Sequence, residues 1–421
     1  MALESALIIA ALVSCGLLLL VLFEPGLSYR VVAPVGSPDT REFLRLIGAI
    51  TDSDVHDATA VEVLTDGNAF YDAELEAIRN ARSSVHIVAF IFHPSAVGDR
   101  FIEALTERAH AGVAVRVIID AIGSFPTPDR YFEKLRAAGG RVAWYQPVRW
   151  YTMKRFNNRT HREIIVVDGA TGFVGGAGIA SHWLDPAKGR AWRDSMLRIA
   201  GGLVCGLQTA FTENWLEATS EILADVSVFP PPVPVSVGKP GLIVVGTPSP
   251  ARSSPARVLF QVVLASARRS LDINSPYFLP DKSARRELVA AARRGVRIRI
   301  MTPGRANNHP LVRRASRRRY GELLEAGIEI LEFQPGMIHA KILVADGTCC
   351  VMGSTNFDSR SFDLNDEVNI VVVDGTVAGR LNTDFERDCA ASTPITYADW
   401  RARSLGEKAL AMLGVFLERQ E

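Results

Sequence analysis

The chain contains an internal repeat, and this repeat constrains the fold more than any other feature of its 421 residues. Residues 61–147 alternate amphipathic helices with short apolar strands and end in an aromatic-Gln-Pro string. The same order of elements returns about 185 residues later and ends in the same kind of string at residues 333–335. Two residue pairs anchor the alignment, namely Gly112-Val113 with Gly295-Val296 and Gln146-Pro147 with Gln334-Pro335. Strands that alternate with helices predict an α/β protein built from two related halves.

The composition suits a globular chain with enough apolar material for two such halves. Hydrophobic residues make up 48% of the sequence and charged residues 22%, which excludes a disordered protein. We expect the first half at residues 61–225 and the second at residues 258–421. The proline-rich residues 226–257 predict a semi-rigid surface connector, interrupted by one short strand at residues 242–245. The five cysteines have no zinc spacing, and we expect neither a metal site nor structural disulfides.

Residues 339–369 hold the densest group of reactive side chains. On an extended strand, side chains two positions apart share a face, so His339 and Lys341 point the same way. An imidazole that can attack or carry a proton, beside a fixed ammonium, suits phosphoryl transfer without a metal or other cofactor. Ser354 and Asn356 follow, with hydroxyl and amide donors for the non-bridging oxygens of a phosphate. Glu367 lies 28 residues after the histidine and is expected to bind its far ring nitrogen.

The first half has a matching string around His161. Asp168 follows this histidine at the same seven-residue spacing that places Asp346 after the histidine of the second half. Gly176 follows, and Asp194, 33 residues after His161, is expected to fix the tautomer of that histidine. Two such histidines, brought together across a pseudo-two-fold axis, form one site with a nucleophile and an acid.

Two positions of the first half differ from the second. The position that corresponds to Lys341 is Glu163, and the position that corresponds to Asn356 is Gly178. An ionised and unpaired carboxylate here would repel a phosphate by roughly 4 kcal/mol at about 4 Å. Arg162 cannot replace the lysine, because it lies on the opposite face of the strand from the histidine. Either Glu163 pairs with a basic residue of the preceding segment, or the first half is catalytically weakened; the candidates there are Lys154, Arg155 and Arg159.

The complete string from His339, H-x-K-x4-D-x6-G-S-x-N, resembles the motif of the phospholipase D superfamily. Arg360, Ser361, Asn365 and Glu367 extend the match, and a buried histidine in a β-hairpin is the alternative interpretation. Further strings resemble bacterial cardiolipin synthases in particular, and they lie at residues 275–281, 303–330, 334–341 and 399–403. The resemblance spans residues 61–421.

The resemblance implies both a fold and a reaction. The implied fold is a duplicated αβα sandwich with mixed sheets, in which two pseudo-two-fold-related halves share one active site. The implied reaction transfers a phosphatidyl group through a phosphohistidine, with His161 as nucleophile and His339 as acid and base. The residues alone leave the reverse assignment open, because only the second half keeps its lysine. The implied catalytic set also includes Lys341, Asp168, Asp346, Asp194 and Glu367, and the implied substrate-binding set is Ser354, Asn356, Gly176, Glu163 and Asn365.

The acceptor decides the product of such a transfer. With phosphatidylglycerol as donor and acceptor the products are cardiolipin and glycerol, whereas with water as acceptor the enzyme is a phospholipase D. A nuclease of the same superfamily would need a basic groove, but the formal net charge is only +1, and we expect no nucleic-acid partner. A weakly active or non-catalytic membrane protein is a further alternative, motivated by Glu163 and Gly178. The sequence does not indicate an oligomeric state.

An apolar segment precedes the two halves. Residues 6–23 are 18 residues without a charge, and as a helix they would extend about 27 Å, close to the roughly 30 Å hydrocarbon core of a bilayer. A cleaved signal peptide is the alternative, but no lysine or arginine precedes this segment. We therefore predict a single transmembrane anchor within residues 1–30. Arg30, Arg41 and Arg45 follow it and place the catalytic part on the cytoplasmic side of the cell membrane.

Two other segments have the composition of lipid-contacting surfaces. Residues 148–160 mix aromatic and basic side chains, which suits either a lip against lipid head groups or an ordinary surface loop. The arginines between positions 313 and 319 either attract an anionic bilayer or form a solvated helix face.

Overall fold

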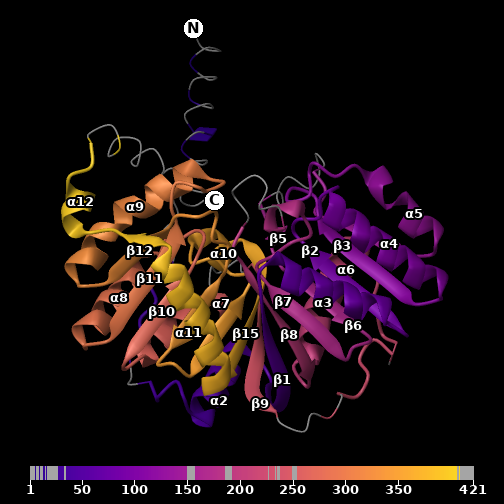
Figure 1. The fold of residues 1–421 in the computed structure, drawn as a ribbon, viewed down its shortest axis with the longest axis horizontal. Helices are drawn as coiled ribbons and strands as arrows, with labels where there is room; N and C mark the ends of the chain where they lie inside the picture. The colour runs from indigo at the N-terminus through magenta and orange to yellow at the C-terminus, as the bar shows by residue number, and fades with distance from the viewer. Residues whose placement is uncertain are drawn as a thin grey trace.

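A mixed β-sheet runs through the described part of the chain (Figure 1). A computed structural model describes residues 27–32, 35–148, 157–184, 192–225, 227–232, 238–248 and 254–404, together with residues 5, 9, 13, 14, 16, 234 and 407. Within these residues the sheet has 16 strands in the order β16-β12-β11-β10-β13-β14-β15-β9-β1-β8-β7-β6-β2-β3-β4, and β5 lies off this path beside β15. The strands are β1 (Val55–Thr65), β2 (Ser84–Ala89), β3 (Ala114–Asp120), β4 (Arg141–Tyr145), β5 (Arg159–Thr160), β6 (Ile164–Val167), β7 (Thr171–Gly175), β8 (Ser195–Gly201), β9 (Lys239–Gly246), β10 (Ser270–Asn274), β11 (Arg297–Pro303), β12 (Glu329–Phe333), β13 (Ile342–Ala345), β14 (Cys349–Gly353), β15 (Asn365–Val373) and β16 (Ser392–Pro394).

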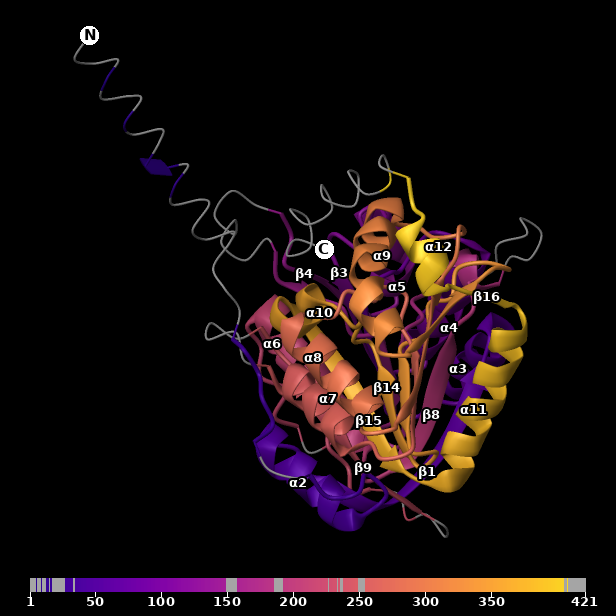
Figure 2. The ribbon, with the colours of Figure 1, turned by 90° about the vertical axis from the view of Figure 1, so that its left-hand side faces the viewer.

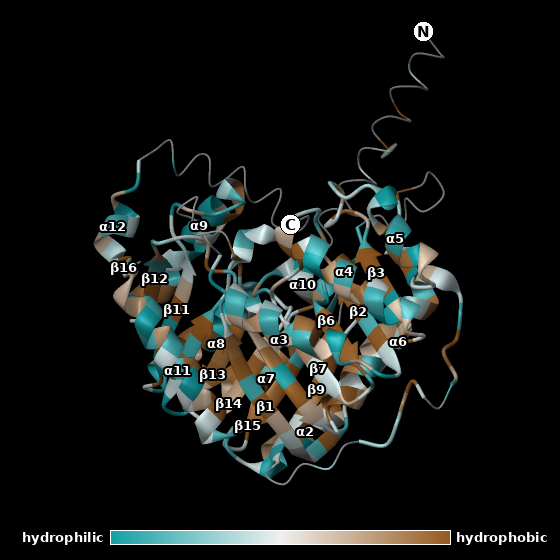
Figure 3. Ribbon diagram, turned by 45° about the vertical axis from the view of Figure 1, so that its right-hand side comes forward, coloured by the Kyte–Doolittle hydropathy of each residue, from teal (hydrophilic) through white to brown (hydrophobic). Residues whose placement is uncertain are grey.

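Helices cover both sides of the strands, as Figure 2 shows. α6, α7 and α8 lie on one side, and α3, α4 and α11 lie on the other. The strands are largely apolar, whereas the outward faces of the helices are hydrophilic (Figure 3). The helices are α2 (Arg41–Thr51), α3 (Gly67–Arg79), α4 (Ala96–His110), α5 (Glu133–Ala137), α6 (Val204–Thr219), α7 (Pro255–Ser266), α8 (Lys282–Arg293), α9 (Pro310–Glu325), α10 (Ser359–Asp363), α11 (Gly375–Ala390) and α12 (Tyr397–Arg401). The predicted α/β class is confirmed.

The strand order is the same in both directions from the middle of the sheet. Outward from β1 the order is β8, β7, β6, β2, β3 and β4, and outward from β9 it is β15, β14, β13, β10, β11 and β12. In each series the last three strands are parallel and the others are antiparallel. The two series meet where β1 pairs with β9, and this pairing has a register shift between His56 and Thr59. The element order of the predicted repeat thus reappears in the order of the strands.

Two stretches outside the predicted halves belong to the core. β9 lies within the predicted connector, yet it pairs with β1 and β15 in the middle of the sheet. The prediction of a surface connector is therefore wrong for residues 239–246, because apolar side chains such as Leu242 are fully buried there. α2 precedes the predicted start of the first half and packs on the core of the second half through Phe43 and Ile47. β9 thus takes the place in the second series that β1 takes in the first.

Three predictions fall on residues that the structure does not describe. Within residues 6–23, the predicted anchor, only positions 9, 13, 14 and 16 are described. Residues 149–156 of the aromatic and basic insert lie outside the described residues, as do 405, 406 and 408–421. The helices that are described include none that combines the length and the apolar character needed to cross a membrane.

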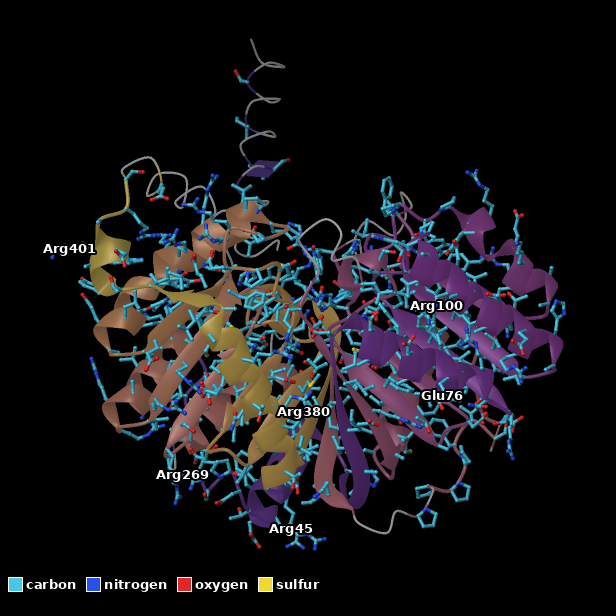
Figure 4. All side chains as sticks on the ribbon, in the orientation of Figure 1. Arg45, Glu76, Arg100, Arg269, Arg380 and Arg401 are labelled. Carbon is cyan, nitrogen blue, oxygen red and sulfur yellow. The ribbon has the colours of Figure 1, made fainter. Side chains whose placement is uncertain are left out.

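Asp168 and Asp346 occupy matching turns that close the β6–β7 and β13–β14 hairpins. Both have a φ of 54°, and both are followed by a glycine with positive φ, as tight hairpin turns require. Each Oδ1 accepts backbone hydrogen bonds from the segment before the first parallel strand of its half; the donors are the N–H groups of Ser83 and Ser84 for Asp168, and of Arg269 and Ser270 for Asp346. Arg269, labelled in Figure 4, marks this end of the second half.

The prediction that these two aspartates join the catalytic set is wrong. Seven residues of extended chain span roughly 20 Å, so Asp346 lies at the far end of its strand from His339. Its carboxylate already accepts the backbone N–H groups of the segment before β10. The aspartate at this spacing therefore fixes the hairpin that carries the histidine.

Replacing Asp346 by alanine should lower the free energy of unfolding by about 3 kcal/mol, because buried backbone donors lose their acceptor and alanine disfavours a positive φ. Asp346→Asn should cost less, since asparagine keeps one acceptor oxygen and tolerates this backbone conformation. Urea unfolding of the three proteins measures both values. Equal stability of Asp346→Ala and the parent would contradict this structural role.

Candidate active site

Both histidines lie where a short segment enters a hairpin. His161 follows β5 and precedes β6, and His339 holds the same position before β13. β6 runs antiparallel to β2, and β13 runs antiparallel to β10. Each histidine therefore lies beside the carboxyl end of the first parallel strand of its half, where α/β proteins usually bind ligands. Both residues are buried, with exposed fractions of 9% and 5%.

A carboxylate of the opposite half holds the imidazole of each histidine. Nδ1 of His161 lies 3.1 Å from Oε1 of Glu367 in β15. Nδ1 of His339 lies 3.0 Å from Oδ2 of Asp194, directly before β8. A carboxylate at Nδ1 fixes the tautomer that leaves Nε2 to react. Each histidine is thus held by a carboxylate from the other part of the chain.

Main-chain hydrogen bonds bring each histidine to the carboxylate of the opposite half. The N–H of His161 donates to the carbonyl oxygen of Asp366 at 2.9 Å, where β5 runs parallel to β15. The N–H of His339 donates to the carbonyl oxygen of Arg193 at 2.7 Å. In both cases the acceptor directly precedes the carboxylate in the chain. The predicted pairing of each carboxylate with the histidine of its own half is therefore wrong, although both carboxylates belong to the site.

Each of these carboxylates has a second donor. The hydroxyl of Ser354 donates to Glu367, and the indole N–H of Trp183 donates to Asp194 at 3.1 Å. Burial raises the pKa of both carboxyl groups, but the hydrogen bonds and charges around them outweigh it, and each pKa lies below its usual value. Both groups are therefore ionised at neutral pH. Ser354, predicted to bind a phosphate, orients Glu367 through this hydrogen bond.

Lys341 lies between the two motifs. Its Nζ is 3.0 Å from Nε2 of His339 and 2.9 Å from the carbonyl oxygen of the same residue. A Cβ on Gly176 would lie 2.9 Å from this Nζ, so the first-half glycine leaves room for the second-half ammonium. Burial lowers the pKa of Lys341 to about 8. Burial and the charge of Lys341 lower the pKa of His339 to about 4, so at pH 7 the lysine is cationic and this histidine neutral.

Glu163 is directed to the backbone of the turn after β2. Its Oε1 accepts a hydrogen bond from the N–H of Ile91 at 3.2 Å. Phe90 in the same turn packs its ring on His161, with 5.0 Å between ring centroids. Burial raises the pKa of Glu163 well above its usual value, which favours an uncharged carboxyl group. Glu163 thus supports the turn that packs against the first histidine.

The two departures of the first half from the second are coupled. A Cβ on Gly178 would lie 2.8 Å from Oε1 of Glu163 and 2.7 Å from the carbonyl oxygen of Ile91. An asparagine at position 178 would therefore collide with the carboxyl group of Glu163. The hydroxyl of Tyr71 also donates to the carbonyl oxygen of Gly178, which fixes the backbone there. In the first motif, Gly178 therefore leaves the room that the buried carboxyl group of Glu163 occupies.

The basic residues predicted to pair with Glu163 do not do so within the described chain. Arg159 forms an ion pair with Asp120, with 3.0 Å between Nε and Oδ2. Arg162 is fully buried and its Nη2 lies 2.7 Å from Glu213, so it faces away from the site as predicted. Lys154 and Arg155 lie outside the described residues.

Two buried amide side chains of the second motif border the site. Asn356 and Asn365 are 4% and 6% exposed. Their Oδ1 atoms have no hydrogen-bond partner among the described residues. Nδ2 of Asn365 lies 3.4 Å from Oε1 of Glu367. Both amides therefore keep hydrogen-bonding capacity, and that of Asn365 lies beside the carboxylate that holds His161.

Aromatic rings enclose the second histidine, and sequence reasoning did not assign them to the site. The ring centroids of Trp183, Trp192 and Tyr277 lie 5.7, 5.0 and 6.4 Å from that of His339. Trp192 directly precedes the Arg193-Asp194 pair, and Tyr277 lies in the string at residues 275–281. Their positions next to these motifs are the sequence feature that could have assigned them to the site. These rings exclude water from the imidazole.

Part of the arginine run is engaged inside the protein. Arg313 and Arg317 lie 2.6 and 3.4 Å from the carboxylate of the buried Glu332. They therefore attach α9 to β12. Arg314, between them on the helix, is exposed.

The cysteines of the described residues are free. Cys349 and Cys350 point to opposite sides of β14 and enter different core clusters, as their adjacent positions predict. Among the described residues no group of three or more His, Cys, Asp or Glu side chains is arranged to hold a metal ion.

Comparison with known proteins gives one family. The family model described as "Cardiolipin synthase, PLD-like domain" matches residues 75–186 and 261–389. A cardiolipin synthase of Geobacillus thermodenitrificans is 34% identical over 369 residues, covering 87% of this chain and 73% of that protein. Cardiolipin synthase 1 of Staphylococcus epidermidis is 32% identical over 377 residues, covering 87% and 75%.

Two solved structures share the fold. A phosphatidylserine synthase of Haemophilus influenzae has a TM-score of 0.69 at 14% identity, covering 90% of this chain and 100% of that chain. A polyphosphate kinase of Porphyromonas gingivalis has a TM-score of 0.54 at 13% identity, covering 93% and 57%. At these identities the likeness concerns the fold alone.

Replacing Glu163 by lysine, the residue of the second half, should destabilise the protein by about 3–5 kcal/mol, because an unpaired ammonium would be buried near Lys341. Glu163→Gln should stay within about 1 kcal/mol of the parent, since its amide oxygen still accepts from Ile91. Urea unfolding compares the variants. A Glu163→Lys protein as stable as the parent would show that a lysine still fits this position.

Proposed function

The chain belongs to the cardiolipin synthase family of phospholipase D-like proteins, and from this premise we propose that it transfers the phosphatidyl group of one phosphatidylglycerol to a second, forming cardiolipin and glycerol. One observation carries the proposal. Two buried imidazoles, each held at Nδ1 by a carboxylate of the other half, share a site with one ammonium. This arrangement supplies a nucleophile, an acid and a phosphate ligand from side chains alone.

In the first step Nε2 of His161 attacks the phosphorus of the donor lipid. The P–N bond forms as the P–O bond to glycerol breaks, and Nε2 of His339 gives its proton to the departing oxygen. Glycerol leaves, and the phosphatidyl group stays on His161. Glu367 stabilises the positive charge that develops on this imidazole, because its carboxylate contacts Nδ1.

In the second step a free hydroxyl of another phosphatidylglycerol attacks the phosphohistidine. Its proton passes to Nε2 of His339, a new P–O bond forms, and the P–N bond to His161 breaks. The products are cardiolipin and an enzyme in its initial protonation state. The family resemblance assigns the role of nucleophile to His161. The reverse assignment is the alternative, because both histidines are held by a carboxylate in the same way.

Lys341 and the two asparagines bind the phosphate in this proposal. An ammonium with a low exposed fraction of 4% interacts strongly with a phosphate anion, because little water screens it. Asn356 and Asn365 have the hydrogen-bonding capacity that phosphate and lipid oxygens can use. A bound phosphodiester also opposes the charge of Lys341 at His339, which favours the protonated imidazole that the first step needs.

We place the two halves as copies of one ancestral unit, since their strand order agrees along the whole series. We also propose that residues 6–23 anchor the protein in the cell membrane with its catalytic part on the cytoplasmic side. Their uninterrupted apolar character supports the anchor, and the arginines that follow support the orientation. Membrane attachment brings the site to its two lipid substrates.

Purified protein in mixed micelles of phosphatidylglycerol should release glycerol and form cardiolipin in equal amounts. With a phosphatidyl ester of p-nitrophenol, whose leaving group needs no acid, His339→Ala should still release about one equivalent of nitrophenol and retain the lipid covalently. His161→Ala should release none. A burst from His161→Ala alone would reverse the two roles, and phosphatidic acid as the only lipid product would make the protein a hydrolase.

The alkaline limb of the pH profile should report Lys341. Its pKa is lowered to about 8, so the ammonium is present below this pH and lost above it. Therefore kcat/KM for the lipid should fall as the pH rises through about 8, and Lys341→Arg, whose residual activity is lower, should show no such limb below pH 10. Initial rates between pH 6 and 10 measure this. A parent profile that stays flat to pH 10 would contradict the role of Lys341.

A further inference from the structure

A large pocket lies outside both histidine motifs, where residues 29–32 and 35 run beside the helices α2 and α7. Its volume is about 400 Å³, within the roughly 300–1,000 Å³ of sites that bind small organic molecules. Figure 2 shows α2 beside α7. The pocket is therefore large enough for a ligand of many heavy atoms.

The lining of this pocket is mostly apolar, and part of it is open to the surface. Seven of its ten residues are aliphatic. Three of these, Val32, Leu46 and Ile50, are 83%, 40% and 42% exposed. Exposed aliphatic side chains that gather in one place mark a site of interaction. A hydrocarbon chain in the pocket would remove them from water.

Two polar side chains of the lining restrict the ligand further. Gln261 is 6% exposed, and its Nε2 has no hydrogen-bond partner among the described residues. Buried polar groups nearly always have a partner, so the ligand is expected to carry an acceptor such as a carbonyl oxygen. Arg30 is exposed and is the one charged side chain among the described residues that line the pocket. The ligand therefore combines an apolar chain, an acceptor and a negative charge.

The segment that forms one wall of the pocket is attached to the second half. The N–H of Tyr29 donates to the hydroxyl of Ser283 at 2.9 Å, and the guanidinium of Arg257 lies 4.4 Å from the centroid of the Tyr29 ring. Nη2 of Arg257 also donates to the carbonyl oxygen of Leu27 at 3.2 Å. Tyr29 follows the proposed anchor at residues 6–23 by six residues, at most about 20 Å of extended chain. With this anchor in place, the pocket lies within reach of bilayer lipids.

We propose that this pocket binds one acyl chain of an anionic phospholipid, with Nε2 of Gln261 donating to the ester carbonyl oxygen and Arg30 contacting the phosphate. A helix of a partner protein would cover the same aliphatic side chains, but its backbone carbonyl groups are bonded within the helix. An acylated phospholipid instead carries an ester carbonyl close to an anionic phosphate. A lipid bound here attaches the catalytic part to the membrane at a second point, apart from the two histidines.

Photo-crosslinking in mixed micelles locates this lipid directly. The probes are two phosphatidylglycerols with a diazirine in one chain, which is joined to glycerol by an ester in one probe and by an ether in the other. All proteins carry His161→Ala, which prevents consumption of the probe. Mass spectrometry should find the ester probe on peptides at residues 29–35, 46–50 and 258–262, with a yield that saturates as its mole fraction rises. The peptide around Ile222, which is 79% exposed and does not line the pocket, reports the non-saturating background.

Gln261→Leu isolates the hydrogen bond, because leucine suits the apolar lining and lacks the donor. The protein with Gln261 should bind the ester probe about 5-fold more tightly than the ether probe, which corresponds to a hydrogen bond of about 1 kcal/mol. Gln261→Leu should bind both probes equally. Arg30→Ala should weaken both probes by the same factor. Arg314→Ala is the matched control and should change neither, since Arg314 is exposed and lies outside the pocket.

Two results would overturn the lipid site. One is labelling of the pocket peptides that does not rise above the Ile222 background. The other is equal binding of the ester and ether probes by the protein that keeps Gln261. The measurement needs no turnover, so either result leaves the proposed phosphatidyl transfer standing. A parent protein that forms no cardiolipin would in turn leave the lipid site standing.

Discussion

Two hydrogen bonds between imidazole and carboxylate cross from one half to the other, and the rest of the site depends on them. Glu367 and Asp194 are fully buried and ionised, and each has a histidine of the opposite half as a partner. Separating the halves would leave each carboxylate with an unpaired charge in the interior, and losing one partner of a buried pair costs about 3–5 kcal/mol. The same two ion pairs therefore fix the histidines and hold the two parts of the chain together.

The backbone makes the crossing possible before any side chain is considered. β5 and β15 run side by side, and the N–H of His161 is bound to the residue before Glu367. The corresponding contact joins His339 to the residue before Asp194. At the far ends of the same hairpins, Asp168 and Asp346 tie the turns to the first residues of β2 and β10. Each histidine is thus fixed from both ends of its hairpin, which restricts the direction of its Nε2.

The sequence predicted the α/β class, the order of the elements and the two histidines, because the repeat and the short motifs are local patterns. It did not predict which carboxylate serves which histidine. Spacings of 28 and 33 residues are compatible with pairing inside a half or between halves, and the backbone contacts of His161 with Asp366 and of His339 with Arg193 decide. The motif also predicts Asp168 and Asp346 as catalytic residues, although a strand length separates them from the histidines. The partner of Glu163 is a backbone N–H, which has no signature in the sequence.

The charge balance of the site explains how a single lysine can suffice. Asp194 and Glu367 each contribute a negative charge and Lys341 a positive one, which sum to one negative charge, while burial raises the pKa of Glu163 well above its usual value and favours its uncharged form. A phosphodiester adds a second negative charge, and in a site of low dielectric this imbalance favours uptake of a proton. In the proposed mechanism the group that accepts this proton is Nε2 of His339, because Nε2 of His161 is the nucleophile. A second lysine at position 163 would neutralise the site without that proton, whereas a neutral Glu163 leaves the substrate itself to recruit the acid that its cleavage requires.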